Sequence, residues 1–540
     1  MTLLHRRTGP RRWRAPGPLV VAALLVTAIL ATPIAAIAVA ASTTGFHEIT
    51  TVLFRPISAT LLRNTILLIV TVTPCCIVLG VGAAWLTERT DLLGRRFFSV
   101  LIVLPLVMPD FAVGYAWHTL APTMPPLAAA TIVMTLASYP LVYLPVVAGM
   151  RRLDPRLDEA AQSLGSRGPS TFLRVTMPLL WPAIAGGALV VIMTLISEYG
   201  AFEIVRFNTF TTEIFTEFKF EPSSATVLSI PLILIAIIVL AAELAVPQPP
   251  NAARASGRRG TRVRLGPSTI LAWVALLGLA ALAIGVPVGT LVYWMVADQA
   301  TTLPADATLW QATSTTVEYS AAGAALAVLL ALPIAMLAAR STALLARLLQ
   351  RAGYLVLALP GVIVALSLVY LSVHIFFRLY ETATLLIIAY ALLAFPLALS
   401  CLMISAQQAP TALRDIGRSL GRSGPWVFIR VTLPLLLPGL LAGFCLVFLT
   451  TTTELTATLV LAPIDTQTLA TQFWAFQSEN AYSAAAPYAL VIIAISTIPA
   501  GLLALWFDSG SASTRTARAV EPDPESIAEP STIVVQQVAA

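Results

Sequence analysis

The sequence has few charged residues, few cysteines and few histidines, and each shortage excludes a class of protein. Charged residues make up 11% of the 540 positions, whereas a typical globular chain has about 25%. One large water-soluble core is therefore excluded, and so is a disordered chain, which needs low hydrophobicity. The four cysteines lie in apolar stretches without Cys-x-x-Cys spacing, which predicts small buried side chains and no disulfide or metal site. They are Cys75, Cys76, Cys401 and Cys445.

The residues that usually carry catalysis are equally scarce. The four histidines lie in distant segments, which argues against a histidine metal site. No Gly-x-x-x-x-Gly-Lys-Ser/Thr pattern occurs, and the one lysine of the chain is Lys219. The chain cannot bind ATP through such a loop. We therefore expect a protein that is not an enzyme, with no metal and no cofactor of its own.

Long apolar runs dominate what is present. Hydrophobic residues make up 58% of the chain and the mean hydropathy is +0.87. Continuous stretches of about 20 apolar residues are typical of membrane-spanning helices, whereas barrel strands alternate apolar and polar residues. The sequence predicts an all-α polytopic membrane protein with about twelve spans. They are residues 18–41, 60–84, 97–121, 127–149, 178–197, 225–246, 269–296, 316–338, 352–376, 382–404, 434–453 and 485–507.

The basic residues gather on alternate loops. Of the 32 Lys and Arg residues, 27 lie in the two terminal segments and in the five loops on their side of the membrane. Basic loops stay in the cytoplasm, so we expect both termini to be cytoplasmic. The net charge of +6 then reflects topology, and we expect no nucleic-acid partner. The opposite loops are acidic, with Glu203, Glu213, Glu217 and Glu221 in one of them.

A polar, basic segment divides the chain into two parts. Residues 247–268 are rich in Pro, Gly and Arg, which is typical of a linker. We predict a basic N-terminus over residues 1–17, two membrane domains over 18–246 and 269–507, and a disordered tail over 508–540.

An internal repeat is the most informative feature of the sequence. The segment Glu159–Pro178 recurs 256 residues later as Asp415–Pro434, with about half of the positions identical. Tyr139-Pro140 matches Phe395-Pro396 in the same register, and Glu198 matches Glu454. Each half therefore has six spans, with the repeated loop between its fourth and fifth. Because six is even, both halves have the same orientation.

The repeated loop has the pattern of a short surface helix. Asp154 can cap a helix that has Pro155 at its first position, and Ala160 and Ala161 favour helix. Gly165 then stops it. The alternative for one loop alone is a stiff connector with a solvated basic face. The loop occurs twice with the same glycine and proline spacing, which favours a surface helix that a two-fold symmetric partner binds.

These residues carry a family resemblance. Glu159-Ala160-Ala161, then Gly165 and a closing Val-Thr-Met-Pro178, resemble the loop of binding-protein-dependent ABC importer permeases. The second copy has Asp415, Gly417, Gly421 and Pro434 at the matching places, so it lacks both alanines and has a shorter acid. The resemblance implies that Glu159 and Asp415 dock the partner and that Gly165 and Gly421 supply the bend. The departure in the second copy puts equal docking of the two loops in question.

The resemblance extends over nearly the whole chain and implies several partners. Two ATPase subunits bind ATP and accept one loop helix each, and an extracytoplasmic binding protein delivers the substrate. The fused two-half arrangement most resembles ferric-iron permeases, in the sequences around Glu198 and Glu454. Permeases for thiamine or another small solute are the alternative within the family.

Placing an ionisable side chain inside a membrane span costs free energy, so such residues mark candidate transport pathways. Asp110 is the deepest of them, and Glu198 and Glu454 lie nearer the outer ends of their spans. Carboxylates suit a hard cation, so a transient ferric contact is chemically reasonable. The alternative is a hydrogen bond between helices or a side chain that reaches the interface. Prolines in the spans are predicted to set kinks. They are Pro105, Pro109, Pro140, Pro145, Pro360 and Pro396.

Two other classes of protein compete with a permease. A gradient-driven six-plus-six transporter would explain Gly94-Arg95-Arg96 between the second and third spans. That class of transporter has the pattern Asp-Arg-x-Gly-Arg-Arg, but here Glu88-Arg89 lies too far before Gly94 to fit the spacing. The second half has no such tripeptide. A scaffold or channel would need no duplicated surface helix.

Overall fold

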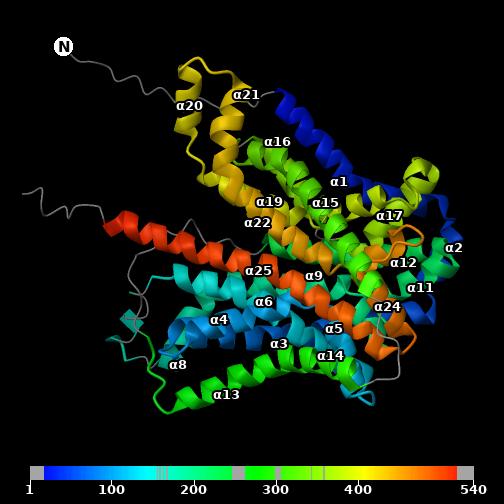
Figure 1. Ribbon diagram of the computed structural model, residues 1–540, viewed down its shortest axis with the longest axis horizontal. Coiled ribbons are helices and arrows are strands. Elements are labelled where there is room, and N and C mark those ends of the chain that lie inside the picture. Colours follow the sequence, from blue (N-terminus) through cyan, green and yellow to red (C-terminus); the bar gives the residue numbers. More distant parts are fainter. Residues whose placement is uncertain are drawn as a thin grey trace, which may run out of the picture.

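The chain folds into a bundle of long helices. The computed structural model describes residues 17–154, 156, 160–161, 163–165, 168–245, 262–297, 306–341, 343–356 and 359–519. Within these ranges nine helices are long and apolar enough to cross a membrane, and two further spans are bent pairs of helices. The all-α polytopic prediction is confirmed (Figure 1). The unbent helices are α1 (Gly17–Thr43), α3 (Pro56–Arg89), α6 (Pro126–Arg152), α9 (Met177–Ser197), α12 (Pro222–Ala245), α13–η3–α14 (Ser268–Ala280, Ala281–Gly285, Val286–Ala297), α15 (Asp306–Ala338), α22 (Leu433–Thr452) and α25 (Tyr482–Ala519).

Prolines break the helix that follows α3 and its counterpart in the second half. α4 (Arg95–Val103) and η1 (Leu104–Val107) meet α5 (Asp110–Leu120) at a bend of 92°. Pro109 is the N-cap of α5, and its missing N–H and extended ψ of 133° end one helix and begin the next. Pro360 has the same place between α16 (Leu344–Leu355) and α17 (Gly361–His374). The predicted single spans over 97–121 and 352–376 are therefore helix pairs.

The predicted span over residues 382–404 is also divided into two helices. The predicted kinks at Pro140 and Pro145, in contrast, do not divide a helix. α18 (Ala383–Leu393) and α19 (Phe395–Gln408) meet at 53°, with Pro396 in the first turn of α19. Pro140 and Pro145 lie inside α6, which runs as one helix from end to end.

The first helix of each half packs against the other half. α1 lies on α15, α16 and α17, and α13 and α14 lie on α4 and α5. Trp273 of α13 meets Phe98 of α4 edge to face, with ring centroids 5.0 Å apart. This exchange buries part of each peripheral helix in the partner half, so the two halves form one interlocked unit.

Short helices lie at the two ends of the bundle. We call the end that carries α8 (Gly168–Thr171), α20 (Thr411–Ser419) and α21 (Gly424–Val427) the basic end, and the opposite one the acidic end (Figure 1). The acidic end carries α2 (Phe46–Leu53), α10 (Gly200–Ile204), α11 (Phe210–Phe220), α23 (Thr456–Leu461) and α24 (Leu469–Ser478). α11 and α24 both begin with a capping box, built by Thr209 with Thr212 and by Thr468 with Thr471. The two halves therefore repeat the way in which these helices begin, as well as the sequence of the loop.

The described part of the linker is attached to the first half. Val263 donates its N–H to the Arg89 carbonyl at 2.9 Å, and Leu265 donates to Asp91 Oδ1 at 2.9 Å. These bonds fix the start of α13 beside the turn that follows α3. α25 runs on as a helix to Ala519, so residues 508–519 of the predicted disordered tail are helical. Residues 520–540 lie outside the described ranges.

Packing of the fifth span on the fourth depends on glycine at different positions in the two halves. A Cβ on Gly187 of α9 would lie 2.8 Å from Val142 Cα of α6, closer than side chains approach backbone. The repeat-equivalent Gly443 of α22 has its nearest neighbour at 3.5 Å, an ordinary contact, whereas a Cβ on Gly439 of α22 would lie 2.8 Å from the Cys401 carbonyl oxygen of α19.

The prediction that all cysteines are buried holds for Cys76, whereas Cys401 and Cys445 are half-buried. It is wrong for Cys75, which is exposed because its neighbour Cys76 occupies the inward face of α3.

Candidate functional site

The bend in the first half brings two of the predicted acids together. Asp110 is the first residue of α5, and Glu198 directly follows the last residue of α9. Their carboxyl groups lie next to each other at the bend. Glu198 Oε1 also accepts the Ala201 N–H at 2.8 Å and so helps to begin α10.

The second half keeps one acid of this pair and lacks the other. Glu454 Oε1 accepts the Ala457 N–H at 3.0 Å, which repeats the geometry of Glu198. The residue after Pro360 is Gly361, where the first half has Asp110 after Pro109. A Cβ on Gly361 would lie 3.1 Å from Glu454 Oε1. The acid chemistry near the contact of the two halves is therefore asymmetric.

Aromatic rings lie between this acid pair and the acidic end. Phe111 and Tyr115 of α5 pack on Phe473 of α24, with centroid distances of 5.0 and 5.5 Å. All three side chains are at most 2% exposed. The cluster joins the two halves.

The second repeated loop forms the predicted helix. α20 ends at Ser419, and Gly421 follows with φ of 75°, a left-handed conformation that glycine adopts without strain. Leu413, Ile416 and Leu420 are 45%, 54% and 73% exposed, so an apolar surface is left open. Asp415 is exposed on the same helix.

Gly417 and Pro434 have structural roles in this loop. A Cβ on Gly417 would lie 3.1 Å from Val427 Cγ2, so the missing alanine lets α20 approach α21 closely. Pro434 lies in the first turn of α22. The π-helical segment η6 (Phe428–Thr432) joins α21 to α22 without a break.

The first repeated loop is described in part. Arg156 N–H donates to Asp154 Oδ1 at 3.0 Å, as expected for the predicted cap. Ala160 and Ala161 are helical, and Gly165 has φ of 84°. Pro178 lies in the first turn of α9, which continues α8 and η2 (Phe172–Thr176). Glu159, the predicted docking acid, lies outside the described residues.

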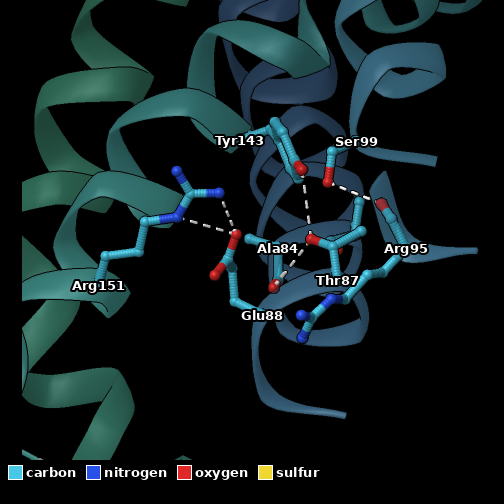
Figure 2. Close-up of polar contacts among 8 residues, drawn as sticks. Ala84, Thr87, Glu88, Arg95, Ser99, Tyr143 and Arg151 are labelled. Atoms are coloured by element: carbon cyan, nitrogen blue, oxygen red, sulfur yellow. Dashed lines mark hydrogen bonds and ion pairs between the residues drawn. The ribbon is translucent and has the colours of Figure 1, made fainter. Parts of the chain in front are cut away.

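Polar contacts fix the first half beside its loop. Arg151 of α6 donates from Nε and Nη2 to Glu88 Oε1 of α3, at 3.0 and 2.5 Å (Figure 2). The hydroxyls of Thr87 and Tyr143 are hydrogen-bonded at 3.2 Å in the same place. The sequence analysis missed this cluster, because the pairs are about 60 residues apart along the chain and follow no short motif.

A basic cluster occupies the corresponding place in the second half. Arg340 follows α15 and lies close to Arg414, Asp415 and Arg418 of α20. Burial and the two neighbouring arginines lower the pKa of Arg340 to about 10, and Asp415 offsets a part of this. The guanidinium stays charged at neutral pH, so the cluster suits an acidic partner surface.

A cavity of about 240 Å³ lies at the acidic end, between the two halves. α5, α10 and the turn after α10 form one wall, and the end of α24 with the start of α25 forms the other. Nine residues line it: His118, Glu203, Ile204, Arg206, Trp474, Gln477, Ser478, Asn480 and Tyr482. Sequence analysis missed this site because its residues come from both halves and no spacing connects them.

Residues 76–247 and 331–509 match the family described as "Binding-protein-dependent transport system inner membrane component", so each half matches once. The chain belongs to this family of transport permeases. The permease is thus a multi-pass protein of the inner membrane, and the resemblance drawn from its repeated loop is confirmed.

Curated relatives support the same assignment. The permease is 38% identical over 471 residues to the Fe(3+)-transport system permease protein FbpB 2 of Haemophilus influenzae, which covers 86% of this chain and 93% of that protein. It is 25% identical over 174 residues to the molybdate/tungstate permease protein WtpB of Pyrococcus abyssi, 31% of this chain and 69% of the relative. It is 30% identical over 140 residues to the molybdenum permease protein ModB of Haemophilus influenzae, 23% of this chain and 61% of the relative.

Proposed function

We propose that the permease is the membrane subunit of an ATP-driven importer of ferric iron. The observation that carries this proposal is the identity of 38% to a ferric-iron permease over 86% of the chain, through both halves. The molybdate permeases match less than a third of the chain each.

The chemistry of the contact between the halves favours a cation over an oxyanion. Asp110, Glu198 and Glu454 are all acidic, and a negative oxyanion such as molybdate would be repelled by them. Carboxylate oxygens suit a hard cation such as Fe³⁺. We assign these three residues to the transport pathway.

Energy is supplied by partners in this proposal. Two ATPase subunits bind ATP and receive the loops around Gly165 and α20, whose apolar face is open for docking. The basic end then faces the cytoplasm, together with both termini, and a binding protein delivers iron at the acidic end. Closure of the ATPase dimer moves the loops together and alternates access between the two sides.

The proposal is tested by ATP hydrolysis in nanodiscs that contain the permease and its candidate ATPase. We expect the ferric-loaded binding protein to stimulate hydrolysis and the empty form to have no effect. Stimulation by a thiamine-loaded or molybdate-loaded protein would assign another substrate to the same permease. A folded permease that assembles with no ATPase would contradict ATP-driven transport and favour a gradient-driven transporter.

The docking assignment has its own test. The double variant Gly165→Glu with Gly421→Glu should lose co-purification of the ATPase, because both left-handed turns and both contact surfaces are changed. Gly82→Ala is a matched control, since a Cβ there meets no atom within 4 Å. Intact co-purification and uptake in the double variant would refute the assignment.

A further inference from the structure

The helix α16 begins at the basic end of the bundle, between two apolar helices (Figure 1). α15 is a candidate membrane span that ends at Ala338, and Arg340 directly after it lies beside α20. α16 follows this turn and leads, past Pro360, into the apolar helix α17. Because the chain leaves one span and enters the next apolar helix here, α16 lies at the boundary of the membrane.

α16 has one buried face and one exposed face. Ala346, Leu349 and Gly353 are buried, and their spacing of three and four residues places them on the same side of the helix. The helix packs on α1, α15 and α19. On the opposite side, Leu344 and Leu348 are 64% and 52% exposed. This outer face of α16 is therefore apolar and uncovered.

Two arginines lie among the exposed leucines. Arg347 and Arg351 are both exposed and four residues apart, so their Cβ atoms are about 5–6 Å from each other. Arg347 follows Leu344 by three residues, and Arg351 follows Leu348 by three, so each arginine lies next to a leucine of the same face. The outer face thus combines two positive charges with apolar side chains.

The described part of the chain offers no acid to these two arginines. Neither of them has an ion pair there. The helices α1, α16 and α19 contain no Asp or Glu, and Glu318 of α15 lies 20 residues before the end of its helix, about 30 Å away. Asp415 of α20 already faces Arg340 and Arg414. Like charges four residues apart repel each other, so an anion from outside the chain would stabilise α16.

We propose that Arg347 and Arg351 bind the phosphate of one anionic phospholipid, whose acyl chains lie along Leu344, Leu348 and Leu355. Guanidinium groups match the geometry of phosphate oxygens and bind them with two parallel hydrogen bonds. Leu355 is 40% exposed and continues the apolar face by one further turn. The site uses the membrane location of α16 and does not depend on the cargo of the permease.

The surroundings of this face favour a lipid over a protein partner. α1 is a candidate membrane span, and it packs on α16. Val21, Leu24 and Leu25 of α1 are exposed, as side chains in contact with acyl chains are. An anionic lipid also fits better than a zwitterionic one, because the ammonium group of a choline head would be repelled by the arginines.

The first half has one arginine of this pair. In the register of 251 residues that aligns the two proline bends, Arg347 corresponds to Arg96 of α4 and Arg351 to Val100. Arg96 is exposed, and Val100 is 60% exposed. The outer face of α4 is therefore apolar with a single positive charge. We expect the tight lipid site on α16 alone, and α4 offers a place to build a second one.

Native mass spectrometry of the full-length permease in detergent tests the site. The protein is titrated with phosphatidylglycerol or with phosphatidylcholine that has the same acyl chains. We expect one phosphatidylglycerol to bind about tenfold more tightly than phosphatidylcholine, because both arginines act on its net negative charge. Inorganic phosphate should not displace the bound lipid, since it makes no contact with the leucines.

Substitutions assign the binding to the two arginines. Arg347→Gln and Arg351→Gln should each weaken binding of phosphatidylglycerol about fivefold, because each removes one positive charge beside the phosphate. Arg96→Gln is the matched control, an exposed arginine at the equivalent place in the first half, and should leave the tight site unchanged. Val100→Arg should add a second tight site, because it completes the pair with Arg96.

The outcomes that would overturn the site are distinct. Equal affinity for the two lipids, or an equal effect of Arg96→Gln and Arg351→Gln, would show that the arginines select no anionic lipid. Displacement by inorganic phosphate would assign them to a small anion. Loss of ATPase co-purification in Arg347→Gln with unchanged lipid binding would assign them to a protein partner. Should the α16 variants fail to fold, Val100→Arg without a second tight site refutes the proposal.

Discussion

The two halves of the permease keep the same loop but fix it in different ways. With Arg89 aligned on Arg340, the residues Thr87 and Glu88 correspond to Ala338 and Ala339. In the loop register of 256 residues, Arg151 corresponds to Gln407 and Tyr143 to Leu399. Both members of the ion pair and both members of the hydroxyl pair are thus absent from the second half.

Apolar packing replaces these polar contacts in the second half. A Cβ on Gly353 of α16 would lie 2.8 Å from Leu399 Cδ2. The end of α15 is instead charged at Arg340, which lies beside α20 itself. Among the described residues, the end of α3 contacts α6, which leads into the first loop, and the end of α15 contacts the loop helix α20. The described contacts beside the two loops therefore differ between the halves.

The largest effect is expected from a methyl group at Gly187, where α9 packs on the backbone of α6. Gly187→Ala should lower the thermal stability strongly, by about 1–3 kcal/mol, because its Cβ meets Val142 Cα at 2.8 Å. Gly443→Ala should be close to neutral, since its nearest neighbour is at 3.5 Å. Thermal melting of both variants in detergent measures this difference, and equal melting temperatures would show that Gly187 and Gly443 are packed alike.

The second prediction compares the transport role of Asp110 and Glu198 in the first half with that of Glu454 in the second half. Asp110→Asn and Glu198→Gln should each lower iron uptake more than Glu454→Gln, because these two carboxyl groups lie together at the bend, whereas Glu454 has Gly361 in place of a second acid. Uptake into vesicles that contain the complete importer, with folded yield measured in parallel, provides the test. Equal losses in all three variants would mean that the pathway uses both halves alike.

The ion pair beside the first loop should contribute less. Arg151 is 64% exposed and Glu88 20%, and such pairs contribute about 0.2–1 kcal/mol. Arg151→Ala should lower the melting temperature slightly, and the difference from the original protein should disappear at high salt. The charge exchange Glu88→Arg with Arg151→Glu should restore the original melting temperature. The pair Ala339→Glu with Gln407→Arg would install the contact in the second half and should stabilise it by a similar amount.

The smallest effect is expected at Arg340. Its lowered pKa means that the charged form is disfavoured in the folded protein, so the penalty is fully present below pH 10 and fades only as the pH rises above that value. Arg340→Gln should therefore raise the melting temperature of the isolated permease by roughly 1–2 °C, equally at pH 6 and pH 9. A lower melting temperature would show that Arg340 stabilises α20 in the absence of a partner.

The long elements could be predicted from the sequence, and the contacts between them could not. Apolar runs located the spans, and the glycines of the repeat located the ends of the loop helices, including the left-handed turn at Gly421. The effects of proline were predicted less well. Pro109 divides a span whereas Pro140 lies within α6, because a helix interior tolerates proline when neighbouring helices support it.

The sequence by itself determined the class of the protein, its two-fold repeat and the position of its loops, since these depend on composition and on order along the chain. Tertiary structure alone decided that Asp110 meets Glu198, that α1 packs on the opposite half, and that Glu203 and Tyr482 line one cavity. The physical reason is that these contacts join segments far apart in the chain. They exist because helices pack in three dimensions, and no local pattern of residues encodes which faces meet.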